Sequence, residues 1–200
     1  DHVALLEPLG IALHALDLGH FQPGMTAGVY GCGPIGLLLI RALRAAGAGF
    51  IQASDPLPHR LEAARASGAD DVRFTEVDSQ PERVDDWGPV DVAFDASGEN
   101  AAVETALRTV RTGGRVVIVG IPPNDRSSFR AALARERGLT IVMSRRAKPH
   151  HMHRAIDLVD RAAVDVGGLI TSRFPISQGP EAFTKLVSRS GLKIVIKPSD

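Results

Sequence analysis

The sequence has little cysteine, few aromatic side chains and no net charge. Of its 200 residues one is cysteine and 4% are aromatic, and 23 Lys and Arg residues balance 23 Asp and Glu residues. A single cysteine excludes a disulfide scaffold and a structural zinc site built from four cysteines. A net charge of zero argues against a partner that is nucleic acid or an anionic membrane surface.

Long apolar runs and targeting signals are also missing. No run reaches the roughly 18 residues that a membrane span needs. The first seven residues do not form the basic segment and apolar core of a signal peptide, so we expect a cytoplasmic protein. The sequence does not begin with Met, and we expect it to be a piece of something longer. Its length suffices for one domain with a hydrophobic core, or for one domain and an appendage.

Short apolar runs alternate along the chain with longer helical patterns, which is typical of βαβ units. Continuous apolar runs predict strands buried on both faces, as in a parallel sheet, at residues 27–30, 49–53, 90–94, 115–119 and 139–143. Apolar spacings of three and four predict crossover helices at residues 35–46, 57–67, 100–110 and 150–162. Gly47, Gly68 and Gly113 stand just past three of these helices, where a left-handed residue is expected. The predicted fold class is α/β, a doubly wound parallel sheet of the Rossmann type.

Two flanking pieces lie outside this alternation. Before the first strand, residues 8–18 predict a helix that ends near Gly19. After the last crossover helix come a predicted strand at 169–174, a helix at 180–188 and a strand at 192–196. We expect this tail to be an appendage that packs on something besides the main sheet.

A GxGxxG pattern at residues 31–36 lies between a predicted strand and a predicted helix. Gly31 permits a tight turn, Gly33 lets the backbone approach a pyrophosphate, and Gly36 allows the helix to pack closely on the strand. The phosphates would then lie at the helix N-terminus, where unpaired N–H groups favour anions. Pro34 suits the first helical turn, because the N–H that it lacks would have no partner there. An ordinary βα turn would explain the glycines alone, so the correct order of strand and helix carries the prediction of a dinucleotide site.

Asp55 ends the next predicted strand, about 20 residues after Gly36, at the spacing of a carboxylate that binds the adenosine ribose. A carboxylate would repel the 2′-phosphate of NADP, and Pro56 follows where an Arg could have bound that phosphate, so we predict NAD as the cofactor. Arg60 could lie over the adenine or reach its ribose. The alternative for Asp55 is an N-cap of the following helix.

Several further motifs occur in a fixed order along the chain. They are Glu7-Pro8-Leu9, Phe94-Asp95-Ala96-Ser97-Gly98, Gly113-Gly114-Arg115-Val116-Val117, Val119-Gly120-Ile121-Pro122, Arg173-Phe174-Pro175 and Gly191-Leu192-Lys193. With the glycine pattern they resemble the zinc-dependent medium-chain alcohol dehydrogenases, especially the sorbitol and polyol dehydrogenase branch, over essentially the whole chain.

The resemblance implies a reaction in which zinc acidifies a bound secondary alcohol or polyol and hydride passes to NAD. The Cys and His zinc ligands of such enzymes lie in an N-terminal, GroES-like domain, and this chain begins after it. Residues 1–168 would then form the NAD-binding domain, and residues 169–200 would return to the catalytic domain. We expect this piece to be inactive alone and the intact enzyme to be a homodimer or homotetramer. The predicted edge strand at 139–143 is a candidate for pairing between subunits.

The resemblance also assigns site residues. Glu7 would face the catalytic zinc, as a ligand or through water; its alternative is an acid near a helix N-terminus formed at Pro8. Arg146 would contact the nicotinamide or the substrate, although two adjacent arginines are more often solvated or paired with acids. The implied cofactor contacts are Gly31, Gly33, Pro34, Ile35, Gly36, Asp55, Arg60, Ser97, Val119, Gly120, Ile121 and Ser144.

Two other functions remain open. One is a zinc-free quinone or enoyl reductase that uses NADPH, against which Asp55 and Glu7 argue. The other is a non-catalytic NAD-binding module, because fold alone does not settle function.

Three other features have plainer interpretations. We expect the histidines at 150, 151 and 153 to lie on the surface rather than to bind a metal. His14 is expected to be a partly buried core residue. Cys32 is expected to be a small side chain that clears the pyrophosphate.

Overall fold

The computed structural model describes residues 1–75 and 87–198. Six strands form one sheet in the order β3-β2-β1-β4-β5-β6, and every neighbouring pair is parallel. The strands are β1 (Thr26–Tyr30), β2 (Phe50–Asp55), β3 (Asp71–Phe74), β4 (Val90–Asp95), β5 (Val110–Ile118) and β6 (Thr140–Met143). The predicted α/β class with a doubly wound parallel sheet is confirmed.

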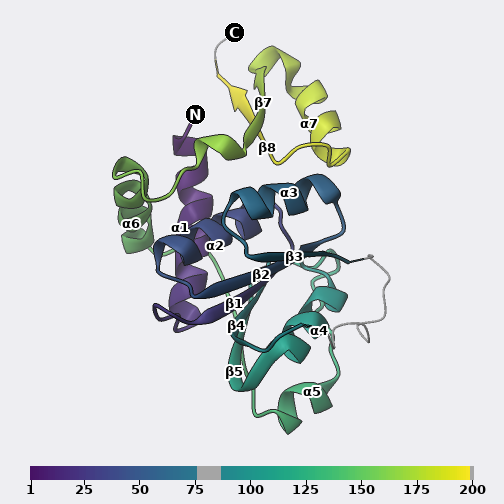
Figure 1. Ribbon diagram of the computed structural model, residues 1–200. Coiled ribbons are helices and arrows are strands. Elements are labelled where there is room, and N and C mark those ends of the chain that lie inside the picture. Colours follow the sequence, from purple (N-terminus) through teal and green to yellow (C-terminus); the bar gives the residue numbers. More distant parts are fainter. Residues whose placement is uncertain (76–86, 199–200) are drawn as a thin grey trace.

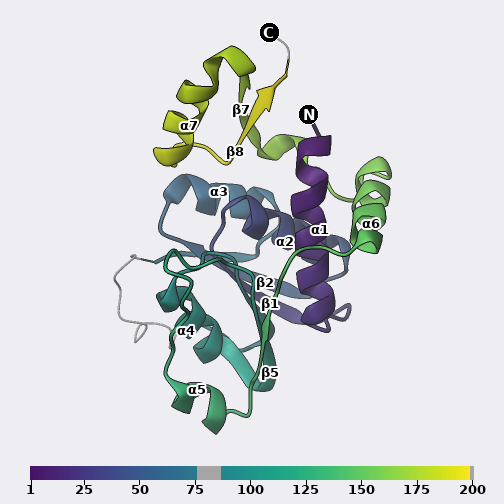
Figure 2. The ribbon, with the colours of Figure 1, turned by 180° about the vertical axis from the view of Figure 1, so that it is seen from behind.

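Helices cover both faces of the sheet (Figures 1 and 2). One face carries α1 (Val3–Leu18), α2 (Pro34–Ala45), α3 (Pro58–Ala66) and α6 (Pro149–Asp160); the other carries α4 (Asn100–Thr109) and α5 (Ala131–Glu136). Strand β4 shows why its residues are apolar in succession. Val92 and Phe94 join the core under the first group of helices, whereas Ala93 joins the core under the second. Burial on both faces therefore accounts for the unbroken apolar runs.

Several predicted boundaries differ from the structure. Helix α1 begins at Val3, so Pro8 lies inside it rather than in its first turn. Two elements were not predicted, because neither has a clear apolar pattern: β3 has one buried residue, and α5 has none. Gly47 and Gly68 have the predicted left-handed backbone, with φ of +85° and +109°. Gly113 also has positive φ, but it lies within β5 and does not end a helix.

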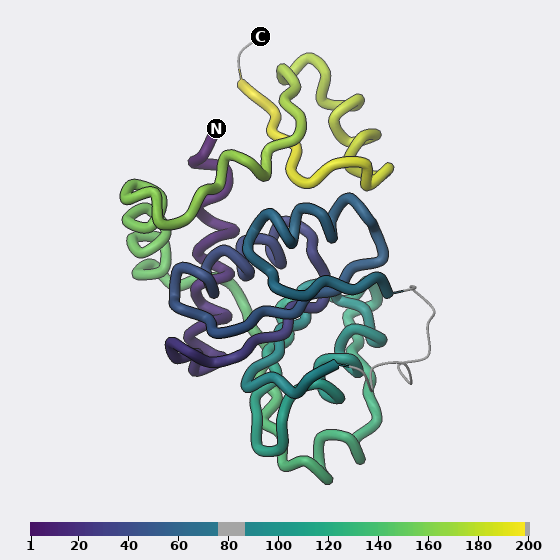
Figure 3. Tube along the Cα trace, viewed as in Figure 1, coloured from purple at the N-terminus to yellow at the C-terminus, as the bar shows by residue number. Residues whose placement is uncertain are grey.

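The tail forms a separate two-stranded parallel sheet from β7 (Ile170–Pro175) and β8 (Lys193–Lys197), with α7 (Gly179–Val187) between them. Two short 3₁₀ turns, Gly167–Leu169 and Ile176–Gln178, flank β7. The tail lies at the same end of the molecule as the N-terminus (Figure 3). There the Asp1 carboxylate pairs with Arg173 Nε at 2.6 Å and with Lys197 Nζ at 3.6 Å. The tail thus packs beside the start of α1 and adds no strand to the main sheet.

None of the helices in the described part of the chain has both the length and the apolar character that crossing a membrane requires.

Candidate functional site

The carboxyl ends of the six parallel strands meet along one edge of the sheet. From the centre, the chain runs outward in one direction through β1, β2 and β3, and in the other through β4, β5 and β6. The two directions separate between β1 and β4. In sheets of this kind, ligands bind in the crevice outside the strand ends at that switch point.

The glycine turn leads from β1 into α2. Gly31 has φ of +101°, and a Cβ added to it would lie 2.8 Å from the Ser97 backbone nitrogen. A Cβ on Gly36 would lie 1.8 Å from the Gly31 carbonyl oxygen. Gly33 is different, because a Cβ there would meet only Arg60 Nη1, at 3.9 Å. The turn requires the first and third glycines for its own packing, whereas the second leaves open space at the N-terminus of α2.

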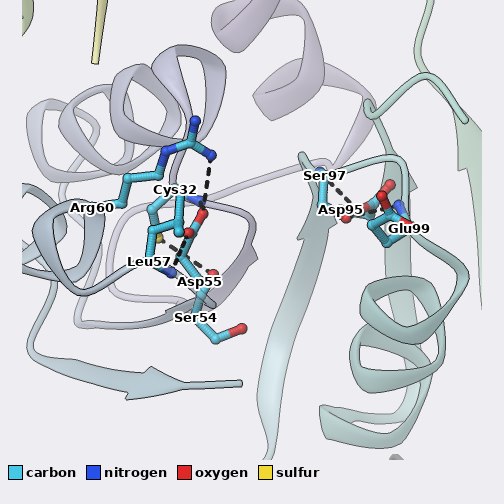
Figure 4. A network of polar contacts seen from close by, with 8 residues as sticks. All are labelled: Cys32, Ser54, Asp55, Leu57, Arg60, Asp95, Ser97 and Glu99. Atoms are coloured by element: carbon cyan, nitrogen blue, oxygen red, sulfur yellow. Dashed lines mark hydrogen bonds and ion pairs between the residues drawn. The ribbon is translucent and has the colours of Figure 1, made fainter. Parts of the chain in front are cut away.

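Asp55 holds the glycine turn to the start of α3 (Figure 4). Its side chain is 2% exposed. Oδ2 accepts the Cys32 backbone N–H at 2.8 Å, and Oδ1 accepts the Leu57 backbone N–H at 2.9 Å. The N-cap of α3 is Leu57, so the N-cap interpretation of Asp55 is wrong.

Arg60 comes from α3 and lies over the same turn. Its Nη1 is 3.6 Å from Asp55 Oδ2, and its side chain is 19% exposed. Its Nε is buried and has no hydrogen-bond partner among the described residues. A buried donor without a partner next to the open space at Gly33 is suited to an anionic or hydroxyl-bearing group.

A second group of residues gathers at the ends of β4, β5 and β6. The N–H groups of Val119 and Gly120 donate to the Asp95 carbonyl oxygen, at 2.8 and 3.1 Å. Ile121 follows and is 85% exposed, which is unusual for a large apolar side chain. Ser144 donates its N–H to the Ile118 carbonyl at 2.8 Å, while its buried Oγ has no partner within the described ranges.

Asp95 was not predicted as a site residue, although it is fully buried at the end of β4. Its Oδ1 accepts the Ser97 N–H at 3.0 Å and the Ser97 hydroxyl at 2.7 Å (Figure 4). Burial raises its pKa above the ordinary value. The signal in the sequence was an acid that closes an otherwise apolar strand just before Ala-Ser-Gly.

Three predicted cofactor contacts thus lie at the glycine turn. They are Pro34 and the half-buried Ile35, in the first turn of α2, and Asp55, at the end of β2. Two other predicted residues stand apart. Glu7 is exposed in α1, and because α1 begins at Val3 the interpretation of Glu7 as an acid near a helix start at Pro8 is wrong. Arg146 is exposed in the loop after β6 with φ of +55°.

The one group of three or more potential metal ligands in the described part of the chain lies elsewhere, at Asp17, His150 and His151. His151 is 1% exposed, so the expectation that it lies on the surface is wrong, whereas His150 is exposed. His151 Nε2 contacts Asp17 Oδ2 at 3.0 Å, and Nδ1 accepts the Lys148 N–H at 3.0 Å. Arg154 also pairs with the Asp17 carboxylate. Both ring nitrogens of His151 thus have protein partners, and the histidine needs no metal to complete its hydrogen bonds. Glu7 is not in the group, and the described residues give the zinc implied by the resemblance no ligand set.

Two further expectations concern buried side chains. His14 is 8% exposed, as expected for a partly buried residue, and burial together with nearby His151 lowers its pKa. Cys32 is fully buried, with Sγ 3.5 Å from the Ser54 carbonyl oxygen. Burial and the Asp55 carboxylate raise the pKa of Cys32, so its thiol stays neutral and is a poor nucleophile.

Known proteins resemble this chain over nearly all its length. A model of the zinc-binding dehydrogenase family matches residues 34–161. Sorbitol dehydrogenase of Bacillus subtilis is 30% identical over 205 residues, which cover 100% of this chain and 58% of the relative. Among solved structures, 2R,3R-butanediol dehydrogenase of Bacillus subtilis aligns with a TM-score of 0.86 at 28% identity, covering 98% of this chain and 57% of that one. An NADP-bound protein of Sinorhizobium meliloti 1021 aligns with a TM-score of 0.88 at 27% identity, covering 98% and 59%. The chain therefore spans a little over half the length of each of these relatives.

Proposed function

The chain belongs to the zinc-binding dehydrogenase family, and from this premise we propose that it is the cofactor-binding part of an NAD-dependent dehydrogenase that oxidises a secondary alcohol or polyol. The observation that carries the proposal is the open backbone at Gly33. Its neighbours Gly31 and Gly36 are fixed by packing, but nothing nearer than 3.9 Å would meet a Cβ on Gly33. A pyrophosphate placed there would meet the N-terminus of α2 and the Arg60 guanidinium.

Each group of residues has one task in this proposal. The glycine turn binds the pyrophosphate, and Asp55 accepts hydrogen bonds from the adenosine ribose. Val119, Gly120 and Ile121 support the nicotinamide, with Ser97 and Ser144 beside it. The bound nicotinamide supplies the hydride acceptor, and the protein's part is to orient that ring toward the substrate.

We favour NAD over NADP because the two oxygens of Asp55 are already fixed against the turn at 2.8 and 2.9 Å. A carboxylate held in that place accepts bonds from a ribose hydroxyl and repels a 2′-phosphate. One solved structure of this fold is bound to NADP and another to NADH, so the fold alone does not decide the cofactor. The choice therefore depends on this side chain and on Arg60.

The remaining roles belong to the same proposal. Glu7 would face the catalytic zinc of the intact enzyme, and Arg146 would contact the nicotinamide or the alcohol. Residues 1–168 would be the NAD-binding domain, and residues 169–200 would join the catalytic domain. Strand β6 is an edge strand of the sheet, so it is available for pairing in a homodimer or homotetramer.

Calorimetric titration of the chain with NADH and, separately, with NADPH tests the proposal. We expect NADH to bind at least about tenfold more tightly, equivalent to about 1.4 kcal/mol. Equal affinities, or tighter binding of NADPH, would overturn the choice of NAD. If neither cofactor binds, the proposal is overturned. The reductase and the non-catalytic NAD-binding module would then also lack a cofactor site in this chain.

A further inference from the structure

The buried Asp95 has an uneven environment that the dinucleotide site does not by itself explain. Its Oδ1 accepts two bonds from Ser97 and a longer one, at 3.4 Å, from the Gly98 N–H. Its Oδ2 is buried and has no partner among the described residues. A buried carboxyl oxygen without a partner costs stability, so its presence calls for a reason.

Asp95 Oδ2 lies against Gly120, in the segment after β5. A Cβ added to Gly120 would lie 2.7 Å from Asp95 Oδ2 and 2.0 Å from the Gly98 nitrogen. The Asp95 carbonyl oxygen also accepts the N–H groups of Val119 and Gly120. One residue thus binds the turn after β4 with its side chain and the end of β5 with its backbone.

The same turn also touches the glycine turn. A Cβ on Gly31 would lie 2.8 Å from the Ser97 nitrogen and 2.9 Å from the Ala96 carbonyl carbon. Three loops therefore meet at Asp95: the turn after β1, the turn after β4 and the segment after β5. Because the three segments pack closely around Asp95, a shift of one loop would displace the others.

From this geometry we propose that Asp95 is a positioning residue for the nicotinamide half of the cofactor. It holds the Ser97–Gly98 turn against Gly120 and so fixes the surface on which the ring docks. The proposal rests on the proposed function, because it presupposes that a dinucleotide binds at this edge.

A comparison of two ligands separates this role from a general contribution to folding. NADH carries the nicotinamide, whereas ADP-ribose lacks it and keeps the rest of the molecule. We expect Asp95→Ala to weaken NADH binding about tenfold or more, because it leaves the N–H and hydroxyl donors of Ser97 and the buried N–H of Gly98 without their acceptor. ADP-ribose binding should change less than about twofold. Asp95→Asn keeps an acceptor at Oδ1 and should restore most of the affinity for NADH.

Asp91 provides a matched control on the same strand. It lies at the amino-terminal end of β4, away from the strand ends where Asp95 lies. There its Oδ2 accepts the N–H and the hydroxyl of Thr26, both at 2.9 Å. Asp91→Ala should lower the melting temperature and leave the ratio of NADH to ADP-ribose affinity unchanged. Equal losses for both ligands in Asp95→Ala, or failure of Asn to rescue, would overturn the proposal.

Two measurements cover the remaining outcomes. If Asp95→Ala does not fold, Ser97→Ala removes one bond at an exposed residue and should give a smaller but still NADH-selective loss. If wild type binds neither ligand, the proposed function fails, and hydrogen exchange then tests the role of Asp95 directly. Faster exchange of the Ser97, Gly98, Val119 and Gly120 amides in Asp95→Ala than in Asp95→Asn and wild type, with β2 unchanged, supports it; unchanged exchange at these amides in Asp95→Ala overturns it.

Discussion

Asp55 and Asp95 are two buried carboxylates at the same edge of the sheet, one on each strand that pairs with β1. Both oxygens of Asp55 accept backbone N–H groups, and Arg60 lies within 3.6 Å. Among the described residues Asp95 forms no ion pair, and its Oδ2 has no hydrogen-bond partner. A buried charge beside a cation can discriminate between charged and neutral ligands, whereas an unpaired buried acid serves mainly through the shape that its hydrogen bonds impose. Under the proposed function, the two halves of the edge would therefore differ: Asp55 would discriminate between cofactors by charge, and Asp95 would act through the backbone that it holds in place.

The largest expected effect comes from the glycine turn, which both halves share. Gly36→Ala places a Cβ 1.8 Å from a carbonyl oxygen, so we expect lost binding and a melting temperature lower by many degrees. Gly33→Ala meets no atom nearer than 3.9 Å. It should keep its stability within about 0.5 kcal/mol yet weaken both NADH and ADP-ribose about tenfold or more. Calorimetry and thermal melting of the two variants check this. Normal NADH binding by Gly33→Ala would mean that the pyrophosphate does not bind at Gly33.

A smaller effect should break the adenosine half alone. Asp55→Ser removes the carboxylate that opposes a 2′-phosphate, and we expect the ratio of NADH to NADPH affinity to fall about tenfold. Asp70→Ser is the matched control, because Asp70 also accepts a backbone N–H, that of Ile51 at 2.7 Å, and also pairs with an arginine, Arg44. It lies just before β3, beside the start of β2 and away from the strand ends where Asp55 lies, and its substitution should leave the ratio unchanged. An unchanged ratio in Asp55→Ser would mean that Asp55 does not contact the ribose.

The smallest effect is a pH trend that sharpens the contrast within β4. Burial raises the pKa of Asp95 above 3.8, so its contribution to stability is greatest below that pH and declines as pH rises through the folded-state pKa. The melting temperature of Asp95→Asn relative to wild type should therefore rise between pH 4 and 7. The hydrogen bond from Thr26 lowers the pKa of Asp91. Its contribution is present above 3.8 and is lost as pH falls, so Asp91→Asn should be most destabilised at neutral pH and converge with wild type in acid. Parallel trends in the two variants would contradict this assignment.

The sequence sufficed for those parts of the molecule in which local pattern and burial agree. The parallel sheet follows from apolar runs such as that of β4, and the left-handed Gly47 follows from its place after a helix. The boundary of α1 did not follow, because Pro8 is usual in a first turn, and here the helix already begins at Val3. Burial of His151 did not follow either, since it depends on α1 packing against α6 through Asp17.

The site shows the same limit. The spacing of Gly31, Gly33 and Gly36 predicted the turn, but only the three-dimensional packing distinguishes the two glycines that the turn requires from Gly33, which leaves space. Asp95 carries no spacing rule, because its partners come from its own turn and from β5. Contacts between segments far apart in sequence are what a local pattern cannot report.

The pairing of β1 with β4 also bears on how the chain folds. Thr26 on β1 bonds Asp91 on β4 across 65 residues, whereas β1 reaches β2 after a single helix. Closing the longer loop costs more chain entropy, so we expect β1, β2 and the helices around them to assemble first and β4 to dock later. Gly31 meets Ser97 only after that docking. A newly synthesised chain would therefore form its glycine turn early, and the proposed nicotinamide surface only after β4 has docked.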